Sequence, residues 1–294
     1  MRMKMKRRAF IQNATMAAAG TMLAPSVVSM ANSIKGPVGI QLYTLKDVIR
    51  NDVKGTLQKV AEIGFKELEV WDYSDGKIFS MPYGDFNKMA NDLGLTIVSG
   101  HYSTGLEPPP KNGSLSLDWN RAVEDAASIG QKYLVIASMG ARERNTLDGY
   151  KKTCALMNRS HEICKKAGVS LGYHNHEYEF IPIEGRIPYE VMMEELDPSI
   201  VFELDIYWST FAKKDPLELF KKYSGRIHLW HVKDMDREKR ERQTDVGSGS
   251  IDYKSVFNAA EVSGMKHFFL EQEYFAGSQF DSIANGFKYL REVV

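Results

Sequence analysis

Short apolar segments alternate with longer amphipathic segments from about residue 38 to the last residue. Short runs rich in β-branched, aromatic and aliphatic residues are typical of buried strands. We therefore expect eight strands, at residues 38–43, 67–71, 96–101, 133–137, 170–174, 201–205, 227–232 and 267–271.

The longer segments have the helical spacing of apolar residues and end at glycines, which commonly follow the last turn of a helix. We expect helices near residues 52–63, 84–93, 118–129, 146–167, 188–196, 215–223, 253–263 and 280–293. Cys154 and Cys164 lie in one of these helices, roughly 15 Å apart along its axis. We expect them to be unbridged, because a disulfide requires α-carbons within about 7 Å.

Eight strands alternating with eight helices predict an α/β fold, a single (β/α)8 TIM barrel over residues 36–294. An open, doubly wound sheet would alternate in the same way, but no glycine-rich nucleotide-binding turn follows the first strand. Gly247-Ser248-Gly249 lies in a polar loop, without the strand and helix that such a motif needs. In a barrel, the proline run 108–110 and the loop 235–250 would lie on the active-site face, where either could form a lid.

Residues 1–31 differ in composition from the rest of the chain and resemble a twin-arginine export signal. Lys6-Arg7-Arg8-Ala9-Phe10 precedes an Ala-rich stretch, and Ser29-Met30-Ala31 has the small residues that a signal peptidase reads. We expect cleavage before Asn32 and an exported, periplasmic protein; a basic tail without a targeting function is the alternative. No other apolar run approaches the roughly 20 residues of a membrane span, so we expect none.

The charge distribution argues against a nucleic-acid partner. The chain has 38 basic and 38 acidic residues, but five of the basic residues and none of the acidic ones lie within residues 1–31. The remainder therefore has a net charge of −5. It also has no basic stripe that could follow a phosphate backbone.

Ligand-type residues gather at the expected carboxyl ends of the strands, where barrel enzymes have their active sites. The densest group is Tyr173-His174-Asn175-His176-Glu177, in which His174 and His176 would share one face of an extended strand. Imidazoles and carboxylates at neighbouring strand ends predict a divalent-metal site. The other strand ends carry Gln41, Tyr43, Glu69, Trp71, His101, Asp205, His231, Lys233, Asp234, Glu271 and Glu273.

Each of these residues also has a purely structural interpretation. A single histidine at a strand end is more often a hydrogen-bonded structural residue than a ligand, and Asp205 alone could cap a turn. Glu203 and Glu273 could be solvated, and the tryptophans at positions 71, 208 and 230 could be core residues. The joint occurrence on four consecutive strands favours the metal site, which requires Asp205 and Glu271 to lie within about 8 Å of each other.

The pattern resembles the sugar phosphate isomerase/epimerase superfamily of xylose-isomerase-like barrels, over roughly residues 36–294. The segments that carry the resemblance are 64–71, 204–206, 231–234 and 270–273. In the sugar enzymes of that superfamily, strands five to eight supply Glu, Asp, His and Glu as metal ligands. The last three correspond to Asp205, His231 and Glu271, and His174 takes the place of the first glutamate.

The resemblance also implies roles for the neighbouring residues. Glu271 would remove a proton beside a carbonyl, and Lys233 and His101 would contact hydroxyls or a developing oxyanion. A metal-bound His174 cannot serve as the second base of an epimerase, so Glu177 or Glu179 would replace it. We expect substrate contacts from Gln41, Glu69, Trp71, His176 and Trp208. A mixed histidine and carboxylate shell favours Mn²⁺, Co²⁺ or Zn²⁺ over Mg²⁺.

These expectations favour a metal-dependent sugar isomerase or epimerase that acts on a small sugar or keto-sugar through an enediolate. The alternative is a lyase or dehydratase for a keto-sugar, such as a 3-keto-glycoside or an inosose, because elimination can proceed with one base. An endonuclease-IV-like phosphodiesterase and a non-catalytic carbohydrate-binding barrel are less favoured. The chain could also form a homo-oligomer.

Overall fold

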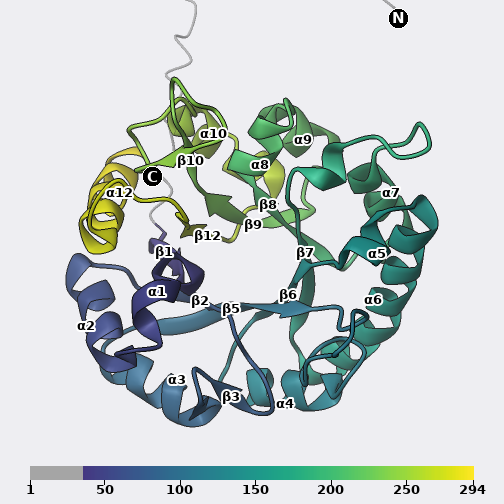
Figure 1. The fold of residues 1–294 in the computed structure, drawn as a ribbon, viewed down its shortest axis with the longest axis horizontal. Coiled ribbons are helices and arrows are strands. Elements are labelled where there is room, and N and C mark those ends of the chain that lie inside the picture. The colour runs from purple at the N-terminus through teal and green to yellow at the C-terminus, as the bar shows by residue number, and fades with distance from the viewer. Residues whose placement is uncertain (1–35) are drawn as a thin grey trace, which may run out of the picture. The chain divides into compact units, whose positions relative to one another are not determined.

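The computed structural model describes residues 36–294, which form a closed barrel of parallel strands surrounded by helices (Figure 1). The predicted export signal, residues 1–31, lies outside the described residues. The strands pair in the order β1-β12-β9-β8-β7-β6-β5-β2, and β1 closes the barrel by pairing with both β2 and β12. The predicted TIM barrel is therefore confirmed. Its strands are β1 (Gly39–Gln41), β2 (Glu67–Val70), β5 (Thr96–Ser103), β6 (Tyr133–Ser138), β7 (Ser170–His174), β8 (Val201–Asp205), β9 (Ile227–Val232) and β12 (His267–Leu270).

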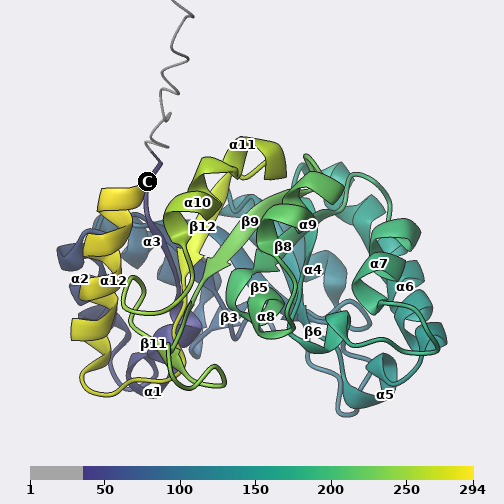
Figure 2. The same ribbon diagram turned by 90° about the horizontal axis from the view of Figure 1, so that it is seen from above.

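Helices cover the outside of the barrel, as both views show (Figures 1 and 2). Each predicted helical segment is present, although residues 253–263 form two short helices. The helices are α1 (Lys46–Ile49), α2 (Val53–Ile63), α3 (Tyr83–Asp92), α4 (Trp119–Ser128), α5 (Ala141–Arg144), α6 (Leu147–Ala167), α7 (Pro188–Glu195), α8 (Ile206–Phe211), α9 (Pro216–Lys222), α10 (Tyr253–Asn258), α11 (Ala260–Ser263) and α12 (Gln279–Val293). Two 3₁₀ helices (Leu42–Leu45 and Tyr178–Phe180) and two hairpins complete the described elements: β3 (Lys77–Ile78) with β4 (Met81–Pro82), and β10 (Asp234–Met235) with β11 (Gln243–Thr244).

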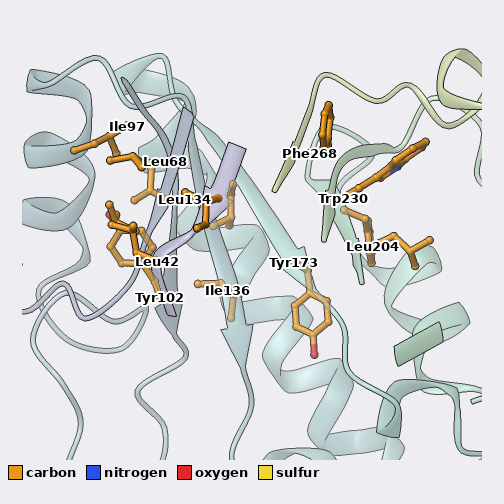
Figure 3. Packing of buried hydrophobic residues seen from close by; sticks show 14 of the residues in the cluster. Leu42, Leu68, Ile97, Tyr102, Leu134, Ile136, Tyr173, Leu204, Trp230 and Phe268 are labelled. Carbon is orange, nitrogen blue, oxygen red and sulfur yellow. The ribbon is translucent and has the colours of Figure 1, made fainter. Parts of the chain in front are cut away.

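The main hydrophobic core lies between the strands and the helices that cover them. Figure 3 shows part of it, including Leu68, Ile136 and Trp230, which are fully buried. Trp230 of β9 stacks on Phe220 of α9, with ring centroids 4.7 Å apart. Trp230 is thus a core residue, which agrees with its structural interpretation. Cys154 and Cys164 of α6 are buried and unbridged, as predicted.

The barrel interior changes from apolar to ionisable toward the carboxyl ends of the strands. A small cluster near the amino ends includes Val201, Leu229 and Phe269. Two residues further along β8 and β9, the same faces carry Glu203 and His231, because alternate residues of a strand point to the same side. The apolar layer therefore forms a floor beneath the polar end of the barrel.

Two register shifts set which side chains reach this polar end. Between β2 and β5, Leu68 pairs with Ile97 but Glu69 pairs with Ser99, so β5 has one extra residue there. Between β8 and β9, Phe202 pairs with Ile227 but Glu203 pairs with Leu229. A bulge re-aims the side chains that follow it. These bulges put Glu69 beside Ser99 and Asp205 beside His231.

The loop after β9 is held by one buried carboxylate. Asp234 accepts hydrogen bonds from the backbone N–H groups of Met235, Gly247, Gly249 and Ile251, at 2.8–3.1 Å. This gives residues 235–250 a defined path along the carboxyl end of the barrel. Within residues 36–294, we find no helix that is both long and apolar enough to cross a bilayer.

Candidate metal centre and active site

Three predicted ligands converge at the carboxyl end of the barrel. Asp205 ends β8, His231 lies in β9, and Glu271 directly follows β12. One ligand atom from each lies within 4.8 Å of the other two. This separation satisfies the requirement that Asp205 and Glu271 lie within about 8 Å for a shared ion. All three side chains are buried.

The facing atoms of this group are held by ion contacts. Asp205 Oδ2, His231 Nδ1 and Glu271 Oε2 are buried and make no hydrogen bond of regular geometry within the described residues, and both carboxylate oxygens lie within 3.1 Å of Lys233 Nζ. His231 Nδ1 nevertheless lies only 2.6 Å from Glu271 Oε2 and 3.9 Å from Asp205 Oδ2. Buried polar atoms are normally paired. One imidazole nitrogen and two carboxylate oxygens facing a common point are a donor set that fits a divalent cation.

His174 lies beside that donor set. Its Nε2 lies 3.9 Å from Asp205 Oδ2, on the side of β8 opposite β9. Ligands about 2.0–2.2 Å from a tetrahedral ion lie about 3.4 Å from one another. The three ligand atoms of Asp205, His231 and Glu271 lie within 4.8 Å of one another without His174, so His174 would move toward them to bind the same ion. The residues that would hold the ion are therefore His174, Asp205, His231 and Glu271.

The outer ring nitrogens of both histidines contact buried carboxylates. His231 Nε2 lies 2.5 Å from Glu69 Oε2, and His174 Nδ1 lies 3.1 Å from Glu203 Oε2. A carboxylate that binds one ring N–H orients the ring and leaves the other nitrogen free for a metal. Glu69 and Glu203 thus fix the two imidazoles from behind.

The charge on His231 depends on these acids. Burial by itself lowers the pKa of His231, but Glu203, Glu271 and Glu69 together raise it well above its ordinary value. Without an ion, His231 is thus an imidazolium held between carboxylates. A metal ligand must release that proton, so the affinity for a cation falls as the pH is lowered.

Gln41 and Glu69 lie under the metal-ligand group and do not line the cavity. Gln41 Nε2 donates to Glu69 Oε2 at 2.8 Å, and Ser99 Oγ donates to Glu69 Oε1 at 2.5 Å. Gln41 and Glu69 are fully buried. We predicted substrate contacts for both, and the structure instead places them where they support His231.

Glu203 is the main residue that the sequence interpretation missed. The interpretation of Glu203 as a solvated residue is wrong, because its side chain is fully buried at the centre of the histidine cluster. Its Oε2 lies 2.8 Å from His101 Nε2 and 3.3 Å from His231 Nε2. Burial, with the nearby Glu69, raises the pKa of Glu203 to about 7. The sequence contained a signal for this position, since Glu203 and Asp205 lie on the same face of a regular strand.

A cavity of about 450 Å³ opens beside the metal-ligand group. Five of the predicted catalytic and substrate-binding residues, on opposite sides of the barrel end, line it: Trp71, His101, His176, Lys233 and Glu271. The loop after β5 also reaches it through residues 111–114, while the lining includes none of residues 235–250. A volume of this size is in the range of small-molecule sites.

Lys233 is a buried cation among the acidic residues at this cavity. Its Nζ lies 2.8 Å from Glu271 Oε2 and 3.1 Å from Asp205 Oδ2, and it donates a hydrogen bond to Glu273 at 3.0 Å. Burial lowers the pKa of Lys233, but these acids raise it well above its usual value. Burial likewise opposes ionisation of Glu271, but Lys233 and His231 lower its pKa. Glu271 is therefore a carboxylate and Lys233 an ammonium group.

On another side of the first cavity, the segment after β7 contributes the imidazole of His176. His176 lines the cavity and stacks on Tyr178, with ring centroids 5.3 Å apart. Burial, followed by the charge of Lys233, lowers the pKa of His176 to about 3, so its ring is neutral. Glu177 is absent from the cavity lining, and Glu179 is buried against Tyr173. The structure therefore does not bring either glutamate to the cavity.

Trp208 lies at the edge of the site. Its ring centroid is 6.1 Å from that of His176, and Lys233 Nζ is 5.8 Å from its ring. Trp208 lines a second cavity instead of the first. A direct substrate contact from Trp208 therefore requires a ligand that extends beyond the first cavity.

Comparison with known proteins places the chain in a family of barrel enzymes. The family model described as xylose isomerase-like TIM barrel matches residues 57–293. An inosose dehydratase from Geobacillus thermodenitrificans (strain NG80-2) is 29% identical over 230 residues, which are 67% of this chain and 74% of the relative. A solved sugar phosphate isomerase/epimerase from Parabacteroides distasonis ATCC 8503 has a TM-score of 0.76 and 29% identity, covering 87% of this chain and 98% of that chain.

A more distant structure has the same fold. The 3-keto-D-glucoside 4-epimerase from E. coli has a TM-score of 0.68 and 15% identity, covering 88% of this chain and 100% of that chain. The chain belongs to the xylose isomerase-like TIM barrel family. This family and the relatives, all named as enzymes, confirm the prediction of an enzyme of the isomerase, epimerase or lyase type.

Proposed function

We propose that the protein is a metal-dependent enzyme that removes a proton from the carbon beside the carbonyl of a sugar or keto-sugar. The single observation that carries this proposal is the group formed by Asp205, His231 and Glu271, whose buried ligand atoms face one another beside a cavity. A bound divalent ion would polarise the carbonyl and acidify the neighbouring C–H bond, so that an enediolate becomes accessible.

The residues of the cavity supply the rest of the chemistry. Glu271 is an ionised carboxylate at the cavity wall, so it can accept the proton. Lys233 is a cation 2.8 Å from Glu271, where it stabilises negative charge that develops on a substrate oxygen. His101 lines the same cavity and contacts Glu203 and Glu69 through Nε2, which holds its ring toward substrate hydroxyls.

The second candidate function is elimination by a lyase or dehydratase. The specific observation in its favour is the neutral imidazole of His176 on the wall where an epimerase would have a second carboxylate. With one carboxylate base, a proton can be removed beside the carbonyl and a leaving group expelled from the next carbon. The named relatives include both epimerases and inosose dehydratases.

Proton–deuterium exchange tests the proposal. The Mn²⁺-loaded enzyme should exchange the proton beside the carbonyl of at least one keto-sugar in a panel of inososes, ketohexoses and 3-keto-glycosides, measured by NMR in D₂O. Glu271→Gln should slow the exchange by at least about 100-fold, whereas Glu261→Gln, an exposed residue of α11, should not. A panel without exchange would refute the proposal. Formation of an unsaturated product would identify elimination.

We also propose that the protein is exported to the periplasm. The support is the Arg7-Arg8 pair, followed by an Ala-rich stretch and small residues at the expected cleavage site. Cell fractionation tests this, because Arg7→Lys with Arg8→Lys should retain the protein in the cytoplasm. An unchanged distribution would contradict export by this route.

A further inference from the structure

A second cavity adjoins the first at the carboxyl end of the barrel. Its volume is about 380 Å³. Helix α8 and the segments after β9 and β12 form its walls. The lining residues include Tyr207, Trp208, Lys239, Arg242 and Tyr274. The metal-ligand residues do not line it, so it is separate from the proposed reaction centre.

A single side chain joins the two cavities. Glu273 lines both of them, and its side chain is 35% exposed. It accepts a hydrogen bond from Lys233 Nζ at 3.0 Å, and its backbone N–H donates to Gln243 Oε1 at 2.7 Å. Lys233 also lies 2.8 Å from Glu271, so Lys233 alone bridges the proposed base and Glu273, where the second cavity begins. A ligand whose reacting carbon lies beside Glu271 can therefore extend past Glu273.

Three aromatic side chains, Tyr207, Trp208 and Tyr274, line the second cavity, and Tyr207 is itself buried. Tyr274 is 42% exposed, which makes it one of the few large apolar side chains that reach solvent in the described residues. Arg242 lies over its ring, 4.7 Å from the centroid. Trp208 packs edge-on against Tyr207, with ring centroids 4.8 Å apart. The exposed ring of Tyr274, with hydrogen-bonding groups around it, suits the C–H face and hydroxyl edge of a sugar ring.

The charges around this cavity indicate an uncharged ligand. Lys239 and Arg242 are balanced by Glu241 and Glu273. A phosphate or carboxylate group is normally recognised by an excess of cations or by a bidentate arginine. Arg242 instead stacks on Tyr274. A neutral sugar unit fits the lining better than a sugar phosphate.

We propose that the second cavity is a subsite for an additional neutral sugar unit, so that the substrate is a disaccharide or glycoside and not a single sugar. This inference rests on the proposed function, in which the reacting sugar occupies the first cavity. In this proposal, Tyr274 and Arg242 contact the additional sugar unit and select substrates with more than one sugar unit.

Binding of non-reactive sugars tests the subsite directly. Isothermal titration calorimetry of the Mn²⁺-loaded protein would compare methyl β-D-glucoside with methyl β-cellobioside, methyl β-maltoside and sucrose, which have no free carbonyl. At least one disaccharide should bind about tenfold tighter than the monosaccharide, a difference expected for one added sugar unit packed on aromatic rings. A preference below about twofold for every disaccharide, or no binding by any of these sugars, would overturn the subsite.

Variants separate the subsite from general effects on the fold. Tyr274→Ala and Arg242→Ala should each remove most of the preference for the disaccharide. Val262→Ala is the matched control, because Val262 is 43% exposed and its carbonyl contacts Gly225, at the amino end of β9. An unchanged preference in both Tyr274→Ala and Arg242→Ala would contradict the assignment.

The result is distinguishable from failure of the proposed function. If the enzyme exchanges no proton of any keto-sugar but still prefers disaccharides, the chemistry is wrong and the subsite stands. If it exchanges the proton of a keto-monosaccharide and shows no preference for disaccharides, the chemistry stands and the subsite is wrong.

Discussion

At the scale of single residues, the carboxylates behind the histidines determine how well the site can hold a cation. Glu203 contacts His174 Nδ1 and leaves Nε2 of the same ring directed toward Asp205. Partners of this kind typically change metal affinity by 10–100-fold when they are removed. Glu203 is therefore a positioning residue, which does not itself line the cavity.

We expect Glu203→Gln to weaken Mn²⁺ binding by about 10–100-fold. A neutral amide binds the His174 N–H more weakly than a carboxylate does. Titration calorimetry on the metal-free protein measures the effect, with Glu261→Gln as the control at an exposed position. The free energy of unfolding without metal should change by less than about 1 kcal/mol, because burial already disfavours the charged form of Glu203. Equal affinity in the two variants would exclude the positioning role.

Glu179 should make the stability of the protein depend on pH. Burial raises the pKa of Glu179 from 4.5 to about 8, although Tyr173 and the His176 N–H group lower it. A carboxyl group with a raised pKa contributes most stability below its unfolded value and loses it as the pH rises through the folded value. The stability contributed by Glu179 therefore declines between about pH 4.5 and pH 8.

Urea denaturation of the metal-free protein at pH 5, 7 and 9 checks this expectation. As the pH rises, the natural protein should lose free energy of unfolding relative to Glu179→Gln. A difference that stays constant over this range would show that Glu179 ionises freely in the fold.

Which residues belong to the site could be predicted from the sequence where the strands are regular. Asp205, His231 and Glu271 follow from their places at strand ends, and the structure brings them together. Glu203 was overlooked because a glutamate within a strand also suits a solvated face. Its alternation with Asp205 contained the missing information. Glu69 and Gln41 could be placed at the polar end of the barrel, but their depth below the cavity depends on how the strands close.

At the scale of elements, the strands that run without interruption had predictable limits. The bounds of β7, β8 and β9 agree with the expected ranges. The first strand ends at Gln41, two residues early, because its side chain accepts a hydrogen bond from Tyr43 N–H and starts a 3₁₀ helix. The bulge that aligns Glu69 with Ser99 could not be predicted from periodicity, because residues 97–100 of β5 are buried on both faces and show no alternation.

The conformation of the loop after β9 depends on one residue, the buried Asp234. We expect Asp234→Asn to destabilise the protein by about 1–3 kcal/mol. The substitution replaces one carboxylate oxygen by an NH₂ group, which cannot accept from the two N–H groups that this oxygen binds. Urea denaturation and limited proteolysis within residues 235–250 measure the change. Asp236→Asn is the control, because Asp236 accepts two hydrogen bonds in the same loop but is partly exposed. Equal effects would mean that the buried acceptor is unimportant.

At the scale of the whole molecule, the alternation of apolar and amphipathic segments was sufficient to predict the closed barrel. A barrel brings the carboxyl ends of all its strands to one face, so distant residues become neighbours without any local signal. The ends of β8, β9 and β12 meet in this way. The cavity sizes and the second cavity depend on loop packing, which hydrophobic periodicity does not encode.

The central claim is that one divalent ion binds between His174, Asp205, His231 and Glu271. Anomalous diffraction from crystals soaked in Mn²⁺ tests it most directly. The account predicts one strong anomalous peak within about 2.0–2.6 Å of ligand atoms of Asp205, His231 and Glu271, with His174 as the fourth protein ligand. The peak should be lost in Asp205→Asn crystals that retain the same fold. No peak at this position, or a peak bound by other residues, would contradict the account.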